Sequence, residues 1–215
     1  MAPRSAAHGP SHPTVEDDER LVSAFENGAP GAGAELYDRL YPVVDATLVR
    51  IIGGRQQDHP DLVQSAFEQL VATISRKKFA RGCTLAGWAA VLTCHVGLNA
   101  LRARRRERGV IDHDHRLDAE AWAERSRAPS IDDLVDARHG VALVRRHLSE
   151  MDADRVTVLL LHVMGHDLAE IAALTGISVA AAQSRLSRGR RELRARIEGT
   201  TARPLSGLFP EGSES

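Results

Sequence analysis

A short helix, a glycine turn and a second helix are predicted over residues 167–197, and no other feature of the sequence restricts the fold as much. Ala172 is small enough for the second helix to cross the first closely, and Gly176 tolerates the left-handed backbone of a sharp turn. Ile177 can fill the corner, and Ser178 can cap the helix that follows. The positions expected to face inward are Leu168, Ile171, Ala172, Val179, Ala182 and Leu186. The pattern therefore predicts a helix-turn-helix.

The rest of the chain also has the composition of a helical protein. Hydrophobic residues make up 43% and aromatic residues only 4% of its 215 positions. Ala, Leu and Arg, which favour helix, are abundant, whereas runs of β-branched residues are few. A chain of this length forms one domain or two small ones. We therefore expect an all-α fold with two small helical domains joined by a flexible linker, the C-terminal one being the helix-turn-helix domain.

Helical periodicity divides the chain. Apolar residues recur at spacings of three and four up to about residue 106 and again from residue 131, but not between them. The intervening segment is rich in Asp, Glu and Arg, and both ends of the chain are rich in Pro, Gly and Ser. The expected division is a disordered tail at 1–13, a helical domain at 14–108, a linker at 109–129, a helix-turn-helix domain at 130–198 and a flexible tail at 199–215.

Start and stop signals place four helices in the first domain. Thr14 and Asp17 form a potential capping box for the first helix, and Thr84 can cap the fourth. Pro42 lies inside the second helix and is expected to kink or restart it. Pro60 suits the first position of the third helix. The fourth helix contains no Asp, Glu, Lys or Arg from Leu85 to Leu101, which we interpret as a helix buried in the core, because polar residues and two glycines make a membrane span a poor alternative.

Charge is distributed very unevenly along the chain. The formal net charge is only -1, which taken alone argues against a nucleic-acid partner. Residues 76–108, however, carry a net charge of +8, and residues 185–196 carry +5. Each basic run closes an otherwise apolar helix, so we favour phosphate contacts over the simpler interpretation of a solvated helix face.

The second helix of the helix-turn-helix offers side chains suited to reading DNA. In this motif the N-terminal half of the second helix enters the major groove. Gln can pair with adenine, and Arg can pair with guanine or a phosphate. An ordinary helical hairpin is the alternative. The residues expected to face DNA are Ser178, Ala181, Gln183, Ser184, Arg185 and Arg188.

Catalytic and metal-binding patterns are weak. Cys94 and His95 are adjacent and point in different directions on a helix, and no Cys-x-x-Cys pair includes Cys83. His162 and His166 lack the intervening Glu of a zinc protease, and the Asp-His alternation at 112–115 falls in the expected linker. We therefore expect no metal, no cofactor and no enzymatic activity.

The location expected from the sequence is the cytoplasm. The N-terminal residues have no apolar segment of the kind found in signal peptides. Two cysteines can form only one disulfide, which is too few to stabilise a secreted disulfide-rich fold. A reducing compartment is therefore the simpler interpretation. No membrane span is expected.

Motifs in both predicted domains resemble bacterial sigma factors of the sigma-70 family, and in particular the small two-domain extracytoplasmic-function (ECF) subfamily. In the first domain, the run Asp61-Leu62-Val63-Gln64-Ser65-Ala66-Phe67 and the segment Leu85-Ala86-Gly87-Trp88, with Leu92, Asn99 and the arginine cluster, are similar to the family pattern. In the second, the matching segments are 158–161, 168–172, 176–178 and 184–186.

The resemblance implies a function for each domain. The first would bind the β′ clamp of core RNA polymerase through Asp61, Gln64, Ser65 and Glu68. It would also melt the promoter −10 element, using Lys77, Lys78, Arg81, Asn99, Arg102, Arg105 and Arg106. The second would read the −35 element through the helix beginning at Ser178 and contact the β flap. Promoter DNA, core RNA polymerase and an anti-sigma factor are the implied partners.

Two other hypotheses remain open from the sequence. One is a stand-alone dimeric helix-turn-helix transcriptional regulator whose first domain serves dimerisation or ligand sensing, which would bind palindromic half-sites about one helical turn apart. The other is a metal-dependent enzyme built on the Cys, His and Asp residues named above.

Overall fold

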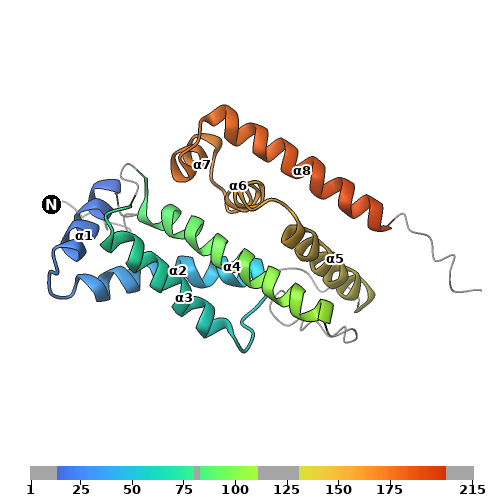
Figure 1. Ribbon diagram of the computed structural model, residues 1–215, viewed down its shortest axis with the longest axis horizontal. Helices are drawn as coiled ribbons and strands as arrows, with labels where there is room; N and C mark the ends of the chain where they lie inside the picture. Colours follow the sequence, from blue (N-terminus) through green and yellow to red (C-terminus); the bar gives the residue numbers. More distant parts are fainter. Residues whose placement is uncertain (1–13, 80–82, 111–130, 202–215) are drawn as a thin grey trace, which may run out of the picture.

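The computed structural model describes residues 14–79, 83–110 and 131–201, and every regular element in these ranges is an α-helix. The all-α fold expected from the sequence is confirmed. Figure 1 shows α4 running through the middle of the molecule, with α1, α2 and α3 on one side and α5, α6, α7 and α8 on the other. No helix in the described part of the chain is both long and apolar enough to cross a membrane.

The first group of helices comprises α1 (Val15–Glu26), α2 (Ala32–Ile52), α3 (His59–Ser75) and α4 (Leu85–Val110). The expected capping box is present, since the Thr14 hydroxyl accepts from the backbone of Asp17 while the Asp17 carboxylate accepts from the backbone of Thr14. The Thr84 side chain likewise accepts from the Gly87 amide at the start of α4.

Pro42 does not restart α2, contrary to one of the outcomes expected from the sequence. The helix runs without a break from Ala32 to Ile52, with Pro42 inside it. Pro42 is exposed, so the carbonyl group of Asp38, which loses its helical donor, lies on the side of the helix that faces water.

Asp18 connects α1 to the start of α4. Its side chain is buried and accepts from the amide of Leu85 at 2.8 Å and from the Arg39 guanidinium at 2.9 Å. A carboxylate at a helix N-terminus satisfies a free amide and interacts favourably with the helix dipole. These two bonds fix the direction in which α4 leaves the loop that precedes it.

The second group comprises α5 (Ile131–Glu150), α6 (Ala153–Val163), α7 (Leu168–Thr175) and α8 (Val179–Thr201). Asp152 caps α6, and Asp167 forms a capping box with Glu170 at the start of α7. These helices agree with the segments expected from periodicity, although α8 continues beyond residue 198, where a tail was expected.

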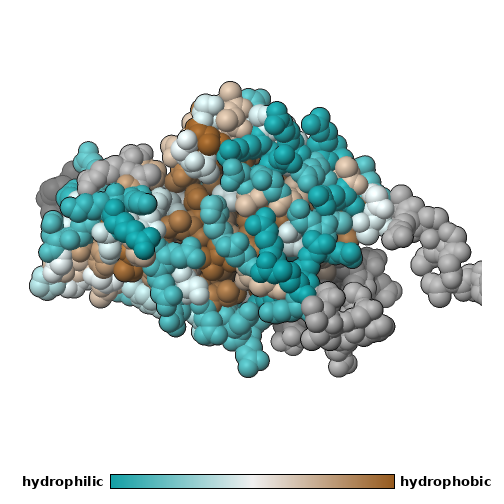
Figure 2. Space-filling model, viewed as in Figure 1, coloured by the Kyte–Doolittle hydropathy of each residue, from teal (hydrophilic) through white to brown (hydrophobic). Residues whose placement is uncertain are grey.

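Two apolar clusters form the core, and α4 contributes to both. One cluster joins α4 to α1, α2 and α3, takes in Leu174 of α7, and includes Leu40, Leu48, Leu85 and Trp88. The other joins α4 and the end of α2 to the second group of helices. Figure 2 shows apolar side chains gathered between α7 and α4, and hydrophilic side chains over α8.

The expected division into domains stays a prediction. Most of the expected linker and nearly all of both expected tails lie outside the described residues.

Candidate nucleic-acid interface

The helix-turn-helix has the local geometry that its sequence predicts. Gly176 ends α7 in the left-handed conformation, with φ of +67°, and its lack of a side chain removes the strain of that backbone. The Ser178 hydroxyl accepts from the amide of Ala181 at 3.2 Å, so Ser178 caps α8 as expected. Ile171, Ala182 and Leu186 are buried between the two helices and α6.

Val179 is a correction to the expected inward face. Val179 is 48% exposed, whereas Ala182 and Leu186, the other positions of this helix expected to face inward, are buried as expected. Val179, Ala180 and Ser187 are therefore part of the exposed surface at the N-terminal half of α8. None of these three residues was among those expected to face DNA.

The predicted DNA-facing residues of α8 lie on one side of the helix-turn-helix. Ser178, Gln183 and Arg188 are exposed, whereas Ala181, Ser184 and Arg185 are partly buried. The Arg185 guanidinium lies 3.1 Å from the carboxylate of Asp154 at the start of α6. This ion pair joins α8 to α6.

The second half of α8 is basic, and ion pairs with Glu150 of α5 and through Glu192 join it to the neighbouring helices. Glu192 accepts from Arg155 of α6 at 2.7 Å and from Arg196 at 3.0 Å. Burial opposes the charged form of Glu192, but these two hydrogen bonds prevail and lower its pKa. The arginines on the outer face of this half are exposed and comprise Arg190, Arg191 and Arg194.

The basic end of α4 is in part covered by the second group of helices. Asn99, Arg105 and Arg106 are exposed. Arg102 instead donates to the backbone carbonyl of Met151 at 2.9 Å and to that of Ser149 at 3.4 Å. Arg105 pairs with Glu150 at 3.0 Å. The structure thus brings these residues to one end of α4 but does not leave all of them facing solvent.

The basic loop after α3 contains the other residues that were predicted to melt the −10 element. Lys77 and Lys78 are exposed, and Lys77 has a left-handed backbone, with φ of +54°. This backbone conformation is strained for a residue with a side chain. Lys77 directly follows the last turn of α3, and its amide donates to the carbonyl of Ile74. Arg81 lies outside the described residues.

The predicted polymerase-binding residues form a stripe along α3. Asp61, Gln64 and Glu68 are exposed, Ser65 is partly buried, and Gln64 donates to Glu68 at 2.9 Å. The spacing of three and four residues puts them on one face of the helix.

Aromatic side chains beside this stripe were missed by the sequence analysis. Tyr37 of α2 lies 4.6 Å from Phe67 of α3 and 5.5 Å from Tyr41, measured between ring centroids. Both tyrosines are exposed. Only 4% of the residues are aromatic. The spacing of the two tyrosines by one helical turn could therefore have indicated from the sequence that they share a helix face.

A buried polar cluster fixes the junction between α2 and α3. Asp45 accepts from Arg55 at 3.0 Å, and its carboxylate lies 2.9 Å from Nε2 of His59. The hydrogen bond from Arg55 lowers the pKa of Asp45, burial opposes this, and the bond to His59 lowers it further. The cluster sets where α3 begins, and so positions the stripe described above.

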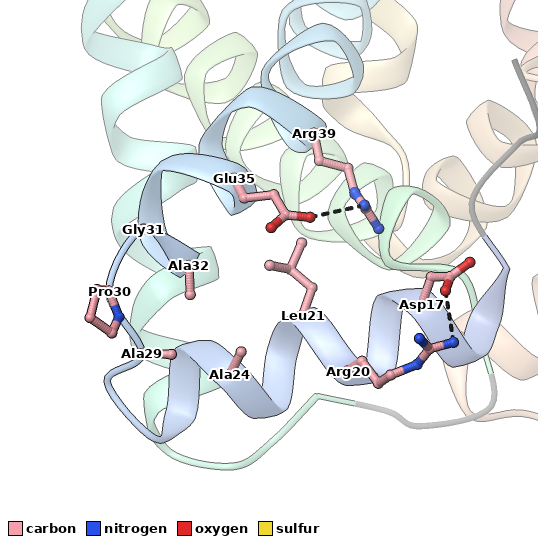
Figure 3. A pocket seen from close by; sticks show the side chains of 10 residues that line it. All are labelled: Asp17, Arg20, Leu21, Ala24, Ala29, Pro30, Gly31, Ala32, Glu35 and Arg39. Carbon is pink, nitrogen blue, oxygen red and sulfur yellow. Dashed lines mark hydrogen bonds and ion pairs between the residues drawn. The ribbon is translucent and has the colours of Figure 1, made fainter.

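A shallow pocket between α1 and α2 has charged side chains at its rim (Figure 3). Arg20 pairs with Asp17 at 2.9 Å, and Arg39 pairs with Glu35 at 3.2 Å. Leu21 points into the space between these pairs. Each of these pairs lies within one helix, whereas the ion pair between Arg39 and Asp18 at 2.9 Å joins α2 to α1.

The residues considered for metal binding do not come together in the described ranges. Within them, no group of three or more His, Cys, Asp or Glu side chains is placed to hold a metal ion. Cys83 and Cys94 are not joined in a disulfide and lie in different apolar clusters. Burial raises the pKa of Cys94 to about 12. The Asp-His alternation at 112–115 lies outside the described residues.

Comparison with known proteins shows which family the chain is similar to. Residues 36–107 match the family model for sigma-70 region 2, and residues 142–193 match that for sigma-70 region 4. The RNA polymerase sigma factor CarQ of Myxococcus xanthus is 30% identical over 178 residues, which are 80% of this chain and 93% of CarQ.

Two solved structures were found to be similar to this chain. One is CnrH in complex with the cytosolic domain of CnrY, with a TM-score of 0.49 and 20% identity over 85% of this chain and 97% of that chain. The other is RpoE of Bartonella quintana in complex with the anti-sigma factor NepR, with a TM-score of 0.44 and 19% identity over 78% of this chain and 98% of that chain.

A region 2 helical bundle followed by a region 4 helix-turn-helix on one chain defines a sigma factor, the class of protein that gives RNA polymerase its promoter specificity. The chain belongs to the sigma-70 family, within the ECF subfamily. It directs promoter recognition, and the stand-alone regulator is not favoured, because residues 36–107 match a sigma region that such a regulator does not require. Sigma factors as a class are not enzymes.

Proposed function

We propose that this sigma factor divides promoter recognition between two described surfaces, the N-terminal half of α8 for the −35 element and the basic end of α4 for the −10 element. The observation that carries the proposal is the exposed N-terminal half of α8 directly after a tight glycine turn. This is the geometry with which a recognition helix enters the major groove.

The −35 surface is proposed to consist of Ser178, Ala181, Gln183, Ser184, Arg185 and Arg188 of α8. Gln183 is exposed and can pair with adenine, and the two arginines can reach guanine or phosphate oxygens. Arg185 would exchange its ion pair with Asp154 for a DNA contact. Arg190, Arg191 and Arg194 follow on the outer face and suit contacts with the phosphate backbone.

The −10 surface is proposed to consist of Lys77, Lys78, Arg81, Asn99, Arg102, Arg105 and Arg106. Melting requires a basic groove that follows the backbone of a single strand, together with groups that hold unstacked bases. Asn99 is exposed one helical turn before the arginines, and its amide can bond to a base edge.

Core RNA polymerase is proposed to bind along α3, through Asp61, Gln64, Ser65 and Glu68, while the second group of helices meets the β flap. The polar stripe is exposed over nearly two turns. The cluster of Asp45, Arg55 and His59 lies at the junction of α2 and α3 and so helps to position the helix that carries this stripe.

Three further properties complete the proposal. The chain catalyses no reaction and uses no cofactor, and its role is to give the polymerase promoter specificity. It works in the cytoplasm, where bacterial RNA polymerase is found. Family membership also leads us to expect an anti-sigma factor that holds it inactive until a signal arrives.

The experiment is selection of DNA by the chain bound to core RNA polymerase, followed by affinity measurements on the selected promoter. Arg185→Ala is expected to weaken promoter binding by about 1–3 kcal/mol if it contacts a base. Arg190→Ala is the matched control and is expected to have a smaller effect that is uniform across DNA sequences and reduces the salt dependence. Equal effects of both substitutions on the selected sequence and on unrelated DNA would contradict the assignment of α8, as would binding of palindromic DNA by a dimer without polymerase.

A further inference from the structure

The first turn of α8 presents apolar side chains at the surface. Val179 and Ala180 are exposed and Ala181 is partly buried, whereas the next large apolar residue of the helix, Leu186, is buried. A single exposed apolar residue on a protein surface needs no explanation. A helical turn that offers apolar groups but no hydrogen-bonding side chain, on the part of the molecule proposed to read DNA, does need one.

This turn is held in a fixed conformation. The Ser178 hydroxyl accepts from the Ala181 amide at 3.2 Å, and the Ala182 amide donates to the Ser178 carbonyl at 2.9 Å. Val is branched at Cβ, so its side chain has one strongly preferred rotamer in a helix. The methyl groups of Val179 are therefore presented in a set direction, and ordering them against a ligand costs little conformational entropy.

The apolar turn lies at the end of α8 that follows the glycine turn. In a helix-turn-helix, the N-terminal residues of the second helix contact base edges in the major groove. The apolar group that base pairs display in that groove is the C5-methyl group of thymine, and the other groups are hydrogen-bond donors and acceptors. Apolar side chains at this position therefore suit thymine, because they can neither donate to nor accept from the other base edges.

Gln183 lies four residues after Val179 and is exposed as well. Residues four apart are neighbours on one side of a helix. Four residues rise about 6 Å along the helix axis, compared with about 3.4 Å between successive base pairs. A base contacted by Val179 therefore lies within about two base pairs of one contacted by Gln183. Since Gln can pair with adenine, the two side chains together suit a short run of A·T pairs.

We propose that Val179 is a specificity-determining residue of this sigma factor and reads a thymine of the −35 element, by packing its methyl groups against the C5-methyl group of that base. The proposal rests on the assignment of α8 to the −35 element made above, and it names a base that this assignment leaves open. The thymine lies within about two base pairs of an adenine contacted by Gln183.

The test replaces thymine by deoxyuridine, which lacks the C5-methyl group and keeps every hydrogen-bonding group of the base. Core RNA polymerase with this chain is bound to the promoter obtained by selection, and each thymine of the −35 element is replaced in turn on either strand. At one position, the replacement is expected to weaken binding by about fourfold, the ratio that corresponds to burial of one methyl group.

Val179→Ala is the variant, because Ala favours helix more than Val does and the position is exposed, so that folding is retained. This variant is expected to bind the unmodified promoter about fourfold more weakly than the wild type does. Deoxyuridine at the sensitive position is then expected to cause little further loss, because side chain and methyl group act as one contact.

Val163→Ala is the matched control. Val163 is also an exposed valine, but it is the last residue of α6 and lies outside α8. This variant is expected to bind the promoter as the wild type does and to keep the full sensitivity to deoxyuridine.

Three results would overturn the proposal: a −35 element selected without thymine on either strand, a wild type that tolerates every deoxyuridine replacement, and a sensitivity that is as large in Val179→Ala as in the wild type. The comparison of Arg185→Ala with Arg190→Ala tests the assignment of α8 itself. A sequence-specific effect of Arg185→Ala without coupling at Val179 removes the role of Val179 and keeps the −35 assignment, whereas equal effects of the two arginine variants contradict that assignment and with it the role of Val179.

Discussion

At the scale of single residues, Asp45 joins two charged partners at the junction of α2 and α3. Its carboxylate is bonded to Arg55 and His59 and is mostly buried. A group whose pKa is lowered by folding stabilises the fold above its unfolded pKa, and that contribution is lost as the pH falls through the folded value. Asp45 is such a group.

The first prediction concerns the substitution Asp45→Asn. It is expected to lower the free energy of unfolding by about 1–3 kcal/mol at neutral pH, because it removes charge-assisted hydrogen bonds to a buried acceptor. The difference from the wild type is expected to shrink below about pH 4, where the Asp45 carboxyl of the unfolded chain is protonated. Urea unfolding at a series of pH values measures both effects.

Asp38→Asn is the control for that prediction, since Asp38 is exposed on the same helix. It is expected to change stability by less than about 0.5 kcal/mol at any pH. A difference between Asp45→Asn and the wild type that stays constant from pH 7 down to pH 3 would contradict the electrostatic account of this cluster.

Val179 illustrates how far single residues could be predicted. The sequence identified the turn at Gly176 and the cap at Ser178 because these positions depend on local backbone geometry. Val179 was placed inward because it is apolar, but Ala182 and Leu186 already fill the contact with α6 and α7. The rotation of the helix was therefore predicted correctly, but whether a neighbouring helix extends far enough to cover Val179 in its first turn depends on tertiary packing, which the local pattern does not contain.

At the scale of elements, glycines set how closely α8 approaches α6. A Cβ atom at Gly189 would lie 2.9 Å from Cδ1 and 3.1 Å from Cγ of Leu159, whereas a Cβ at Gly199 would have no neighbour within 4 Å. Both glycines are within α8. Gly189 therefore allows α8 to pack closely on α6, whereas Gly199 makes no close contact that requires a glycine.

The second prediction compares Gly189→Ala with Gly199→Ala. Gly199→Ala is expected to raise the free energy of unfolding by up to about 1 kcal/mol through helix propensity. Gly189→Ala gains the same propensity but is expected to lose about 1–3 kcal/mol to overpacking against Leu159. Denaturant unfolding of both variants measures the difference, and equal stabilities would show that α8 does not pack tightly on α6.

Helix α4 shows what element-scale prediction could and could not reach. The absence of charge from Leu85 to Leu101 predicted a buried helix, and the helix is buried. Only one apolar face was expected, with Leu85, Trp88, Leu92, Val96 and Leu98 in it. The structure places Leu98 with Ala90 and Cys94 in a second stripe, whose partners lie at the end of α2 and in the second group of helices. Contacts between residues so far apart in sequence leave no local periodicity.

At the scale of the whole molecule, the charge distribution accounts for the two proposed DNA-binding surfaces. The net charge of -1 conceals two basic segments, one at the end of α4 and one along α8. Acidic groups and helix-end carbonyls of α5 cover part of the first. The sequence indicated the basic segments but not which arginines face solvent, since that depends on how the two groups of helices pack together.

The measurement that tests the central claim most directly is transcription in vitro from a template carrying the selected promoter. Core RNA polymerase with this chain is expected to start transcripts at one defined position downstream of both promoter elements, and core polymerase alone is expected to make none there. Arg185→Ala is expected to reduce the transcript, by about tenfold or more if the lost contact is worth 1.4 kcal/mol or more, whereas Arg190→Ala retains most of it. A stable complex of the chain with core polymerase that produces no promoter-dependent transcript would contradict the account.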